Sequence, residues 1–264
     1  MTQHRFSAAD LDDLRYAKSL LEHPSLAARI AGVLGSPIER GLDMLPTRAS
    51  DAVALATRKS LETALSFAVS TMDEERRDAV NWTHKLAVAA TGAAGGVFGI
   101  SALAIELPLS TTIMLRSIAD IARSEGERIK DPESKLACLE VFALGGSESS
   151  DDASDSAYFA VRVSLAKALG EAAEHLARRG LTQHGTPAMV RFLTQVAVRF
   201  GVPVSEKVIA QSLPVVGAAG GAVLNALFMD HFQDMARGHF VVRRLERAHG
   251  PEAVRRVYDS IRKS

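Results

Sequence analysis

The chain has 264 residues, of which 47% are hydrophobic but only 5% aromatic, and Ala, Leu and Val supply most of the apolar side chains. Ala and Leu favour helices, whereas strands are enriched in aromatic and β-branched residues, so the composition predicts an all-α protein. The 31 basic and 31 acidic residues balance each other. This balance excludes long-range attraction of the whole molecule to nucleic acid.

The cysteine content and the N-terminal sequence indicate the cellular compartment. A single cysteine, Cys138, allows no internal disulfide and supplies no thiolate set for zinc. The first residues include early acidic side chains and lack the apolar stretch that a secretory signal needs. We therefore expect a cytoplasmic protein without a cofactor.

Apolar residues recur at helical spacing in successive segments, and prolines and glycines mark the boundaries between these segments. The predicted helices cover residues 10–34 with a break at Pro24, 50–72, 82–107, 108–126, 131–144, 157–179, 187–200, 204–212, 214–250 and 251–261. The acidic, serine-rich sequence between 145 and 156 predicts an exposed loop. We expect one compact bundle, in which residues 1–48 form a helical extension of a domain spanning 49–264.

Two of these helices, 82–107 and 214–250, are rich in Gly and Ala, and both contain the sequence GAAGG. Glycines four residues apart share one helix face and let another backbone approach closely. We therefore predict that the two helices pack against each other at the centre of the bundle. The glycines that would form this contact are Gly92, Gly95, Gly96, Gly99, Gly217, Gly220 and Gly221.

The same two segments allow an alternative, an integral membrane protein. Leu86–Ile105 contains 20 successive uncharged residues and Val208–Met229 is also largely apolar, and a stretch of about 20 apolar residues can span a bilayer. Four glycines dilute the first segment, and Gln211, Pro214 and Asn225 interrupt the second. We therefore predict buried core helices.

Two longer blocks resemble a known family. Residues 107–126, LPLSTTIMLRSIADIARSEG, are similar to the signature stretch of the bacterial EcsC family, and residues 213–240, LPVVGAAGGAVLNALFMDHFQDMARGHF, are similar to its second hallmark. The likeness covers roughly residues 49–245. The family is named for a gene neighbour of an ABC-type exporter, so the resemblance implies a helical fold more than an activity. Some members are labelled peptidases, but no residue here matches a catalytic role.

A polar stripe on the predicted helix 108–126 is the first candidate site. Pro108 would start this helix, and the free N–H groups of its first turn, with Arg116 as a second clamp, would hold an anion. The alternative is an ordinary ion pair between Arg116 and Asp120 that fixes the helix in the bundle. The stripe consists of Ser110, Thr111, Thr112, Arg116, Asp120 and Arg123.

Metal-binding and catalytic patterns are weak in this sequence. Asp230, His231 and Asp234 lie on adjoining turns and are a weak candidate for a divalent metal, but their spacing matches no known ligand motif. No nucleophile elbow or phosphate-binding loop occurs in a fitting context. We therefore expect no metal and favour a protein that is not an enzyme, with a hydrolase site near Arg116 and Asp120 as the alternative.

The C-terminal region carries a local excess of positive charge. Residues 235–264 contain eight Arg or Lys and three acidic residues, and basic helices of this kind bind anionic lipid. We predict a non-enzymatic protein at the inner face of the membrane, bound to anionic lipid or to a membrane transporter. The solvated outer face of a bundle is the alternative interpretation. The residues that would face lipid are Arg243, Arg244, Arg247, Arg255 and Arg256.

Overall fold

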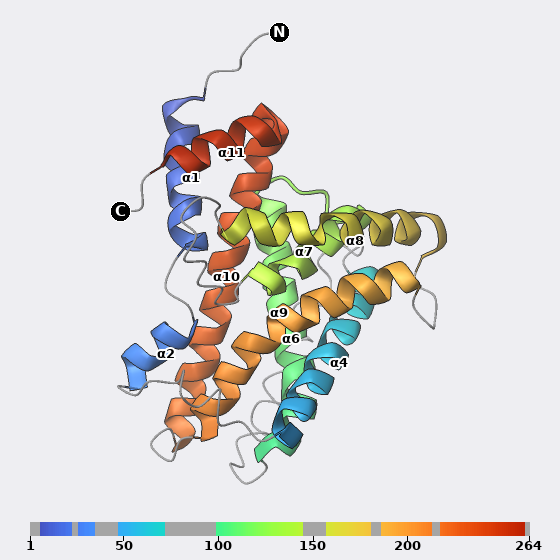
Figure 1. The fold of residues 1–264 in the computed structure, drawn as a ribbon, viewed down its shortest axis with the longest axis vertical. Helices are drawn as coiled ribbons and strands as arrows, with labels where there is room; N and C mark the ends of the chain where they lie inside the picture. Colours follow the sequence, from blue (N-terminus) through green and yellow to red (C-terminus); the bar gives the residue numbers. More distant parts are fainter. Residues whose placement is uncertain are drawn as a thin grey trace.

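The computed structural model describes residues 6–22, 26–34, 47–71, 99–144, 157–180, 186–212 and 217–261. Within these ranges the chain forms nine α-helices and no strand, so the predicted all-α class is confirmed (Figure 1). The helices are α1 (Ala8–Leu21), α2 (Leu26–Leu34), α4 (Thr47–Thr71), α6 (Gly99–Ser124), α7 (Pro132–Leu144), α8 (Ala157–Arg179), α9 (Pro187–Ser212), α10 (Gly217–His249) and α11 (Pro251–Ser260).

The longest of these helices, α10, connects two parts of the bundle. At one end of the molecule α1 and α11 pack against α10, and toward the other end α6, α9 and α2 pack against it (Figure 1). Helix α4 packs on α6 and α9, and α8 packs on α7 and α9. The main core therefore lies among α4, α6, α7, α8, α9 and α10.

Phenylalanine rings form the centre of the main core. Phe142 lies 4.8 Å from Phe200 and 5.3 Å from Phe232 between ring centroids, and Phe228 lies 5.2 Å from Phe232. These separations fall in the range preferred by interacting aromatic pairs. A second, smaller core surrounds the fully buried Tyr258 and joins α1, α11 and the adjoining ends of α8 and α10.

Glycine and proline end or begin several helices as predicted. Gly126 has a φ of 79° just beyond α6, Gly180 has a φ of 66° beyond α8, and Gly250 has a φ of 85° before α11. These are backbone conformations that side chains other than glycine adopt at a cost. Pro251 then occupies the first turn of α11, where its missing N–H removes no helical hydrogen bond.

Two predicted helix boundaries are wrong because prolines lie inside continuous helices. Pro108 is inside α6 and Pro203 is inside α9, where the sequence pattern predicts a new start at 108 and a break before 204. An internal proline costs about 3 kcal/mol. Leu107 and Val204, beside the two prolines, are fully buried, and such burial offsets part of this cost.

Several predicted features lie outside the described residues. They include residues 82–98 of the first apolar helix, with Gly92, Gly95 and Gly96, and the acidic segment 145–156. Gly99, Gly217, Gly220 and Gly221 lie at the starts of α6 and α10, and their surroundings are also outside the description. The predicted packing of the two Gly/Ala-rich helices therefore stays a prediction.

A different glycine is found at a close helix crossing. A Cβ atom on Gly238 in α10 would lie 2.6 Å from Cγ of Leu21 and 3.0 Å from the carbonyl oxygen of Ala17 in α1. Both distances are shorter than van der Waals contact, and the second involves backbone. The contact between α1 and α10 therefore requires glycine at this position.

We predict that Gly238→Ala lowers the free energy of unfolding by about 1–3 kcal/mol, because α1 has to move away from α10. Gly201→Ala in α9 is the matched control. Its Cβ would have no atom within 4 Å, and we expect it to stabilise by about 0.5–1 kcal/mol through better helix propensity. Urea unfolding measures both values. Equal stability of the two variants would show that the helices do not approach this closely.

Candidate functional site

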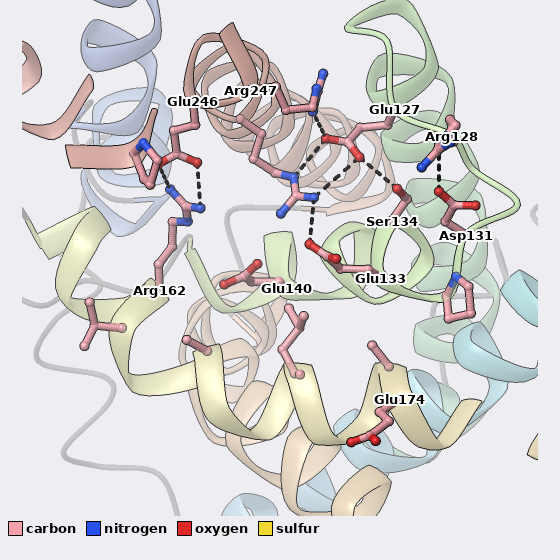
Figure 2. A pocket seen from close by; sticks show the side chains of 18 of the residues that line it. Glu127, Arg128, Asp131, Glu133, Ser134, Glu140, Arg162, Glu174, Glu246 and Arg247 are labelled. Atoms are coloured by element: carbon pink, nitrogen blue, oxygen red, sulfur yellow. Dashed lines mark hydrogen bonds and ion pairs between the residues drawn. The ribbon is translucent and has the colours of Figure 1, made fainter. Parts of the chain in front are cut away.

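An open groove of about 1020 Å³ lies between α7 and α8 and is closed at one side by α10 and the start of α11 (Figure 2). The turn between α6 and α7 forms one end of it. One wall is largely apolar and comes from α8. The opposite side and the floor carry most of the charged side chains. The residues of the apolar wall are Phe159, Val163, Ala166, Leu169 and Ala173.

The turn after α6 places Glu127 at the edge of the groove. The N–H of Glu127 donates to the carbonyl of Ala122 at 3.0 Å, and the N–H of Gly126 donates to that of Arg123 at 3.1 Å. This pair of bonds, with a left-handed glycine between them, is the Schellman ending of a helix. It reverses the chain after α6 and directs Glu127 toward α10.

Glu127 is the acceptor at the centre of a charged cluster. Nε of Arg243 donates to it at 2.9 Å and Oγ of Ser134 donates at 2.8 Å, while Arg247 forms an additional ion pair (Figure 2). Burial alone would raise the pKa of Glu127, but Arg243, Ser134 and Arg247 favour the carboxylate, and the pKa lies below its ordinary value. Glu127 is therefore ionised and joins the turn, α7 and α10.

A second ion pair joins α8 to α10. Arg162 donates to both carboxylate oxygens of Glu246, at 2.7 and 2.9 Å. Burial would lower the pKa of this guanidinium, but Tyr158 and Glu246 raise it above its ordinary value. The guanidinium carbon also lies 5.4 Å from the ring centroid of Tyr158, within cation–π range. This bidentate geometry leaves Arg162 fully committed to protein partners.

Glu140, on α7, is different from the other charged residues of the groove. It lines the groove and is only 3% exposed, and it forms no hydrogen bond with any residue that the structure describes (Figure 2). Burial raises the pKa of Glu140 to about 7, although the charges of Arg162 and Arg243 act in the opposite direction. Glu140 therefore changes its charge near neutral pH.

The neighbour of Glu140 in the core is His239, on α10. Nε2 of His239 lies 3.7 Å from Oε2 of Glu140, and Nδ1 lies 3.1 Å from the hydroxyl of Tyr158. His239 is fully buried, and burial holds its pKa well below the ordinary value. The imidazole is therefore neutral, so it does not neutralise the Glu140 carboxylate.

The groove as a whole is acidic. Seven carboxylates and five guanidinium groups line it, an excess of two negative charges when all carboxylates are ionised. The carboxylates are Glu127, Asp131, Glu133, Glu140, Glu174, Glu246 and Glu252, and the guanidinium groups belong to Arg128, Arg162, Arg243, Arg247 and Arg255. The lining of the groove therefore has a net negative charge, although three of its arginines come from the basic C-terminal region.

The polar stripe of α6 differs from the predicted anion site. Because α6 begins at Gly99, Pro108 is not at a helix start, and the expected free N–H groups are absent there. The hydroxyl of Ser110 donates to Leu107 and that of Thr112 to Pro108, while the Thr111 side chain is buried.

The predicted ion pair of the stripe also has a different partner. Within the described chain Asp120 pairs with Arg123 at 2.6 Å, rather than with Arg116. Arg116 is half-buried in the same helix. Ser110, Thr112, Asp120 and Arg123 therefore make contacts within α6, and an anion-binding role for the stripe stays a prediction.

The weak metal candidate consists of residues with other partners. Asp234 forms ion pairs with Arg29 at 3.3 Å and with Arg237 at 3.1 Å, and His231 is buried with its ring against Phe232. Asp230 is exposed. Among the residues that the structure describes, no three His, Cys, Asp or Glu side chains come together as a metal site.

Most of the arginines predicted to face lipid are paired with carboxylates. Arg243 and Arg247 belong to the Glu127 cluster, Arg244 contacts Asp13 at 2.8 Å and Glu125 at 2.7 Å, and Arg255 lies 3.8 Å from Asp259. Arg256 is exposed. The positive charge of this region is therefore largely compensated within the fold.

The prediction that the two apolar segments are core helices rather than membrane spans is tested only in part. Among the described helices, none is both long and apolar enough to cross a bilayer. The segment 208–229 is shared between the end of α9 and the start of α10. In its described part Val208, Leu224 and Phe228 are buried, whereas Val223 is 44% exposed.

Sequence reasoning missed Glu140, Glu127 and Arg162. For Glu140 a signal exists, because it is an isolated acidic residue within the apolar sequence Leu136–Leu144, and ionisable residues are rarely buried without a partner. His239 follows the same pattern in α10. Glu246, the partner of Arg162, is 84 positions away in the chain, and Arg243, the ionic partner of Glu127, is 116 positions away. These ion pairs therefore have no local signal in the sequence.

Fold and site together define an all-helical protein with an acidic groove, lined by a buried carboxyl group that has no cationic partner among the residues that the structure describes. The chain belongs to the EcsC protein family, whose family model matches residues 21–245. This match confirms the resemblance of the two sequence blocks and extends it to the end of α1. Searches of curated proteins and of solved structures found no significant match.

Proposed function

We propose that this EcsC family protein is a non-enzymatic binding protein, and that the groove between α7 and α8 is its ligand site. The observation that carries the proposal is Glu140, a carboxyl group that is buried, lines the groove and has no hydrogen-bond partner in the described chain. An ionised carboxyl group in such a place is unfavourable unless something pairs with it. A ligand in the groove would supply that partner.

The lining of the groove supports a ligand site. Ligand pockets combine a mostly apolar wall with a few polar groups that fix orientation. Here α8 provides the apolar wall, and Glu140 lies on the opposite side, on α7. The groove volume of about 1020 Å³ is at the upper end of the range for small-molecule sites, roughly 300–1,000 Å³.

The possible nucleophiles near the groove are not activated. The hydroxyl of Ser134 donates to Glu127, which is ionised and paired with two arginines. The thiol of Cys138 is completely buried, and burial raises its pKa far above the ordinary value. Nucleophilic catalysis needs a deprotonated or base-assisted group. These contacts favour binding over hydrolysis.

We predict that filling the groove abolishes ligand binding. Ala166 is exposed on α8 and lines the groove, so Ala166→Trp places an indole in it. Ala160→Trp is the matched control, because Ala160 is exposed on the same helix but is not among the lining residues. Saturation-transfer NMR with a panel of cationic, neutral and anionic fragments measures binding.

Fragments that bind the wild type should bind the control equally and Ala166→Trp at least tenfold more weakly. If no fragment of any charge binds the wild type, or if Ala166→Trp binds them all as well as the wild type does, the groove is not the ligand site.

We also propose a peripheral membrane role, at the inner surface or on a membrane transporter. Large aliphatic side chains are exposed in the first halves of three helices, with Leu55 of α4 at 70%, Ile105 of α6 at 77% and Val223 of α10 at 44%. These parts of the helices lie toward the same end of the molecule, opposite α11 (Figure 1). In the sequence, the uncharged stretch that begins at Leu86 continues into the first residues of α6. This apolar end favours membrane contact more than the paired arginines do.

Co-sedimentation with vesicles of neutral phosphatidylcholine, with and without anionic phosphatidylglycerol, tests the membrane role. The double variant Leu55→Ser, Ile105→Ser should lose most of the binding, and binding should change little with salt because apolar contact is not screened. The variant Arg255→Gln, Arg256→Gln is the control and should bind like the wild type. Salt-sensitive binding that only the arginine variant loses would assign the contact to the C-terminal region. Absence of binding to both vesicle types would contradict the lipid role.

A further inference from the structure

We infer that the groove binds a primary alkylammonium group, with the ammonium against Glu140 and the alkyl chain along the apolar wall of α8. This inference rests on the proposed function, because it names the ligand class of the same site. The ligand chemistry is that of a free amine or of a lysine side chain, and the experiment below distinguishes these two sources.

The sign of the charge follows from the pairing within the groove. Arg162 is held bidentately by Glu246, and Arg243 is held by Glu127 and Glu133. An anionic ligand would have to displace one of these carboxylates. A cationic ligand needs no displacement, because Glu140 is ionisable and has no cation in direct contact among the described residues. The excess of carboxylates over guanidinium groups in the lining supports the same sign.

The size of the charged group follows from the burial of Glu140. Glu140 presents one carboxyl group with 3% exposure, which suits a compact point charge. A divalent cation would need several oxygen ligands, and no set of three acidic, His or Cys side chains meets in the described chain. A guanidinium group presents five donors in a rigid fork, which one buried carboxyl group does not satisfy.

The apolar wall indicates what the ammonium is attached to. Val163, Ala166 and Ala173 lie along one face of α8 and line the groove, and Val163 is 66% exposed. An alkyl chain placed on this face would remove apolar surface from water on both partners. The combination of an apolar wall and a single carboxyl group therefore matches an amphipathic monocation.

Binding of the ammonium should be coupled to loss of a proton from Glu140. Titratable and charged groups face Glu140 from α7, α8 and α10 and from the turn that precedes α7. They are Glu133 on α7, Tyr158 and Arg162 on α8, His239, Arg243 and Glu246 on α10, and Glu127 in the preceding turn. Ion pairing lowers the pKa of Glu127 and raises the pKa of Arg162 and of Arg243, so these three groups stay charged between pH 6 and 8. Burial keeps Tyr158 and His239 neutral over the same range.

The direction of the pH effect follows from this coupling. With the pKa of Glu140 at about 7, the carboxylate fraction increases from pH 6 to pH 8, while an alkylamine stays protonated over this range. Affinity for the ammonium should therefore increase about tenfold over the same range.

Isothermal titration calorimetry with n-hexylammonium chloride tests the inference on the full chain. Hexan-1-ol and hexanoate are the matched neutral and anionic probes, and N-acetyl-lysine methylamide represents a lysine side chain. We expect n-hexylammonium to bind at least tenfold more tightly than either matched probe. Tighter binding of the lysine derivative would indicate a protein or peptide as the source of the amine, and tighter binding of n-hexylammonium a free amine.

Glu140→Gln should lose at least tenfold in affinity for n-hexylammonium and should lose the dependence on pH. Glu171→Gln is the control, because Glu171 lies on α8 outside the groove lining and is paired with Arg191. Its binding should be unchanged. Circular dichroism confirms that each variant is folded before it is compared.

Three results would overturn the inference. They are equal binding by Glu140→Gln and the wild type, equal binding at pH 6 and pH 8, and tighter binding of hexan-1-ol or hexanoate than of n-hexylammonium. If hexan-1-ol or hexanoate binds more tightly and Ala166→Trp abolishes its binding, the groove remains the ligand site. That result would reject only the cationic ligand. Absence of any fragment binding to the wild type would reject both.

Discussion

Buried charges at the junction of α7, α8 and α10 have to be neutralised within the fold. The ion pairs that neutralise them hold α8 and the turn after α6 against α10. Glu127 is ionised and almost completely buried, and it is held by Arg243 and Ser134. Removing one partner from such a buried cluster is strongly destabilising, because the other charge is left uncompensated. The cluster therefore fixes the turn after α6 and the start of α7 against α10, and in doing so forms one end of the groove.

The same constraint explains why the C-terminal arginines have an internal role. As a sequence, residues 235–264 are basic and suggest an anionic partner. In the fold, acidic residues of α1, of the turn after α6 and of α7 come to lie against α10, so most of this positive charge is matched within the chain. Glu140 and His239 have no oppositely charged partner in contact among the described residues, and both lie within the family match at residues 21–245.

Local features of the fold could be predicted from the sequence, and long-range ones could not. Helical periodicity located the helices, and Gly126, Gly180 and Pro251 marked true ends because their backbone preferences act locally. The boundaries predicted at Pro108 and Pro203 were wrong, because both prolines lie inside continuous helices whose burial offsets part of the local cost. In the candidate site, the burial of Glu140 could have been predicted, because Glu140 is an isolated acidic residue in an apolar helix. The pairing of Arg162 with Glu246 could not, because 84 residues separate them.

The free energy of unfolding of the wild type and of Glu140→Gln, measured between pH 4.5 and pH 8, tests most directly whether Glu140 is a buried carboxyl group without an ionic partner. A pKa raised to about 7 from 4.5 means that the folded state keeps its proton over a range where the unfolded state loses it. The wild type should therefore lose about 3 kcal/mol relative to Glu140→Gln as the pH rises from 4.5 to 8. A constant difference between the two proteins over this range would show that Glu140 titrates normally, and would contradict the account of the groove.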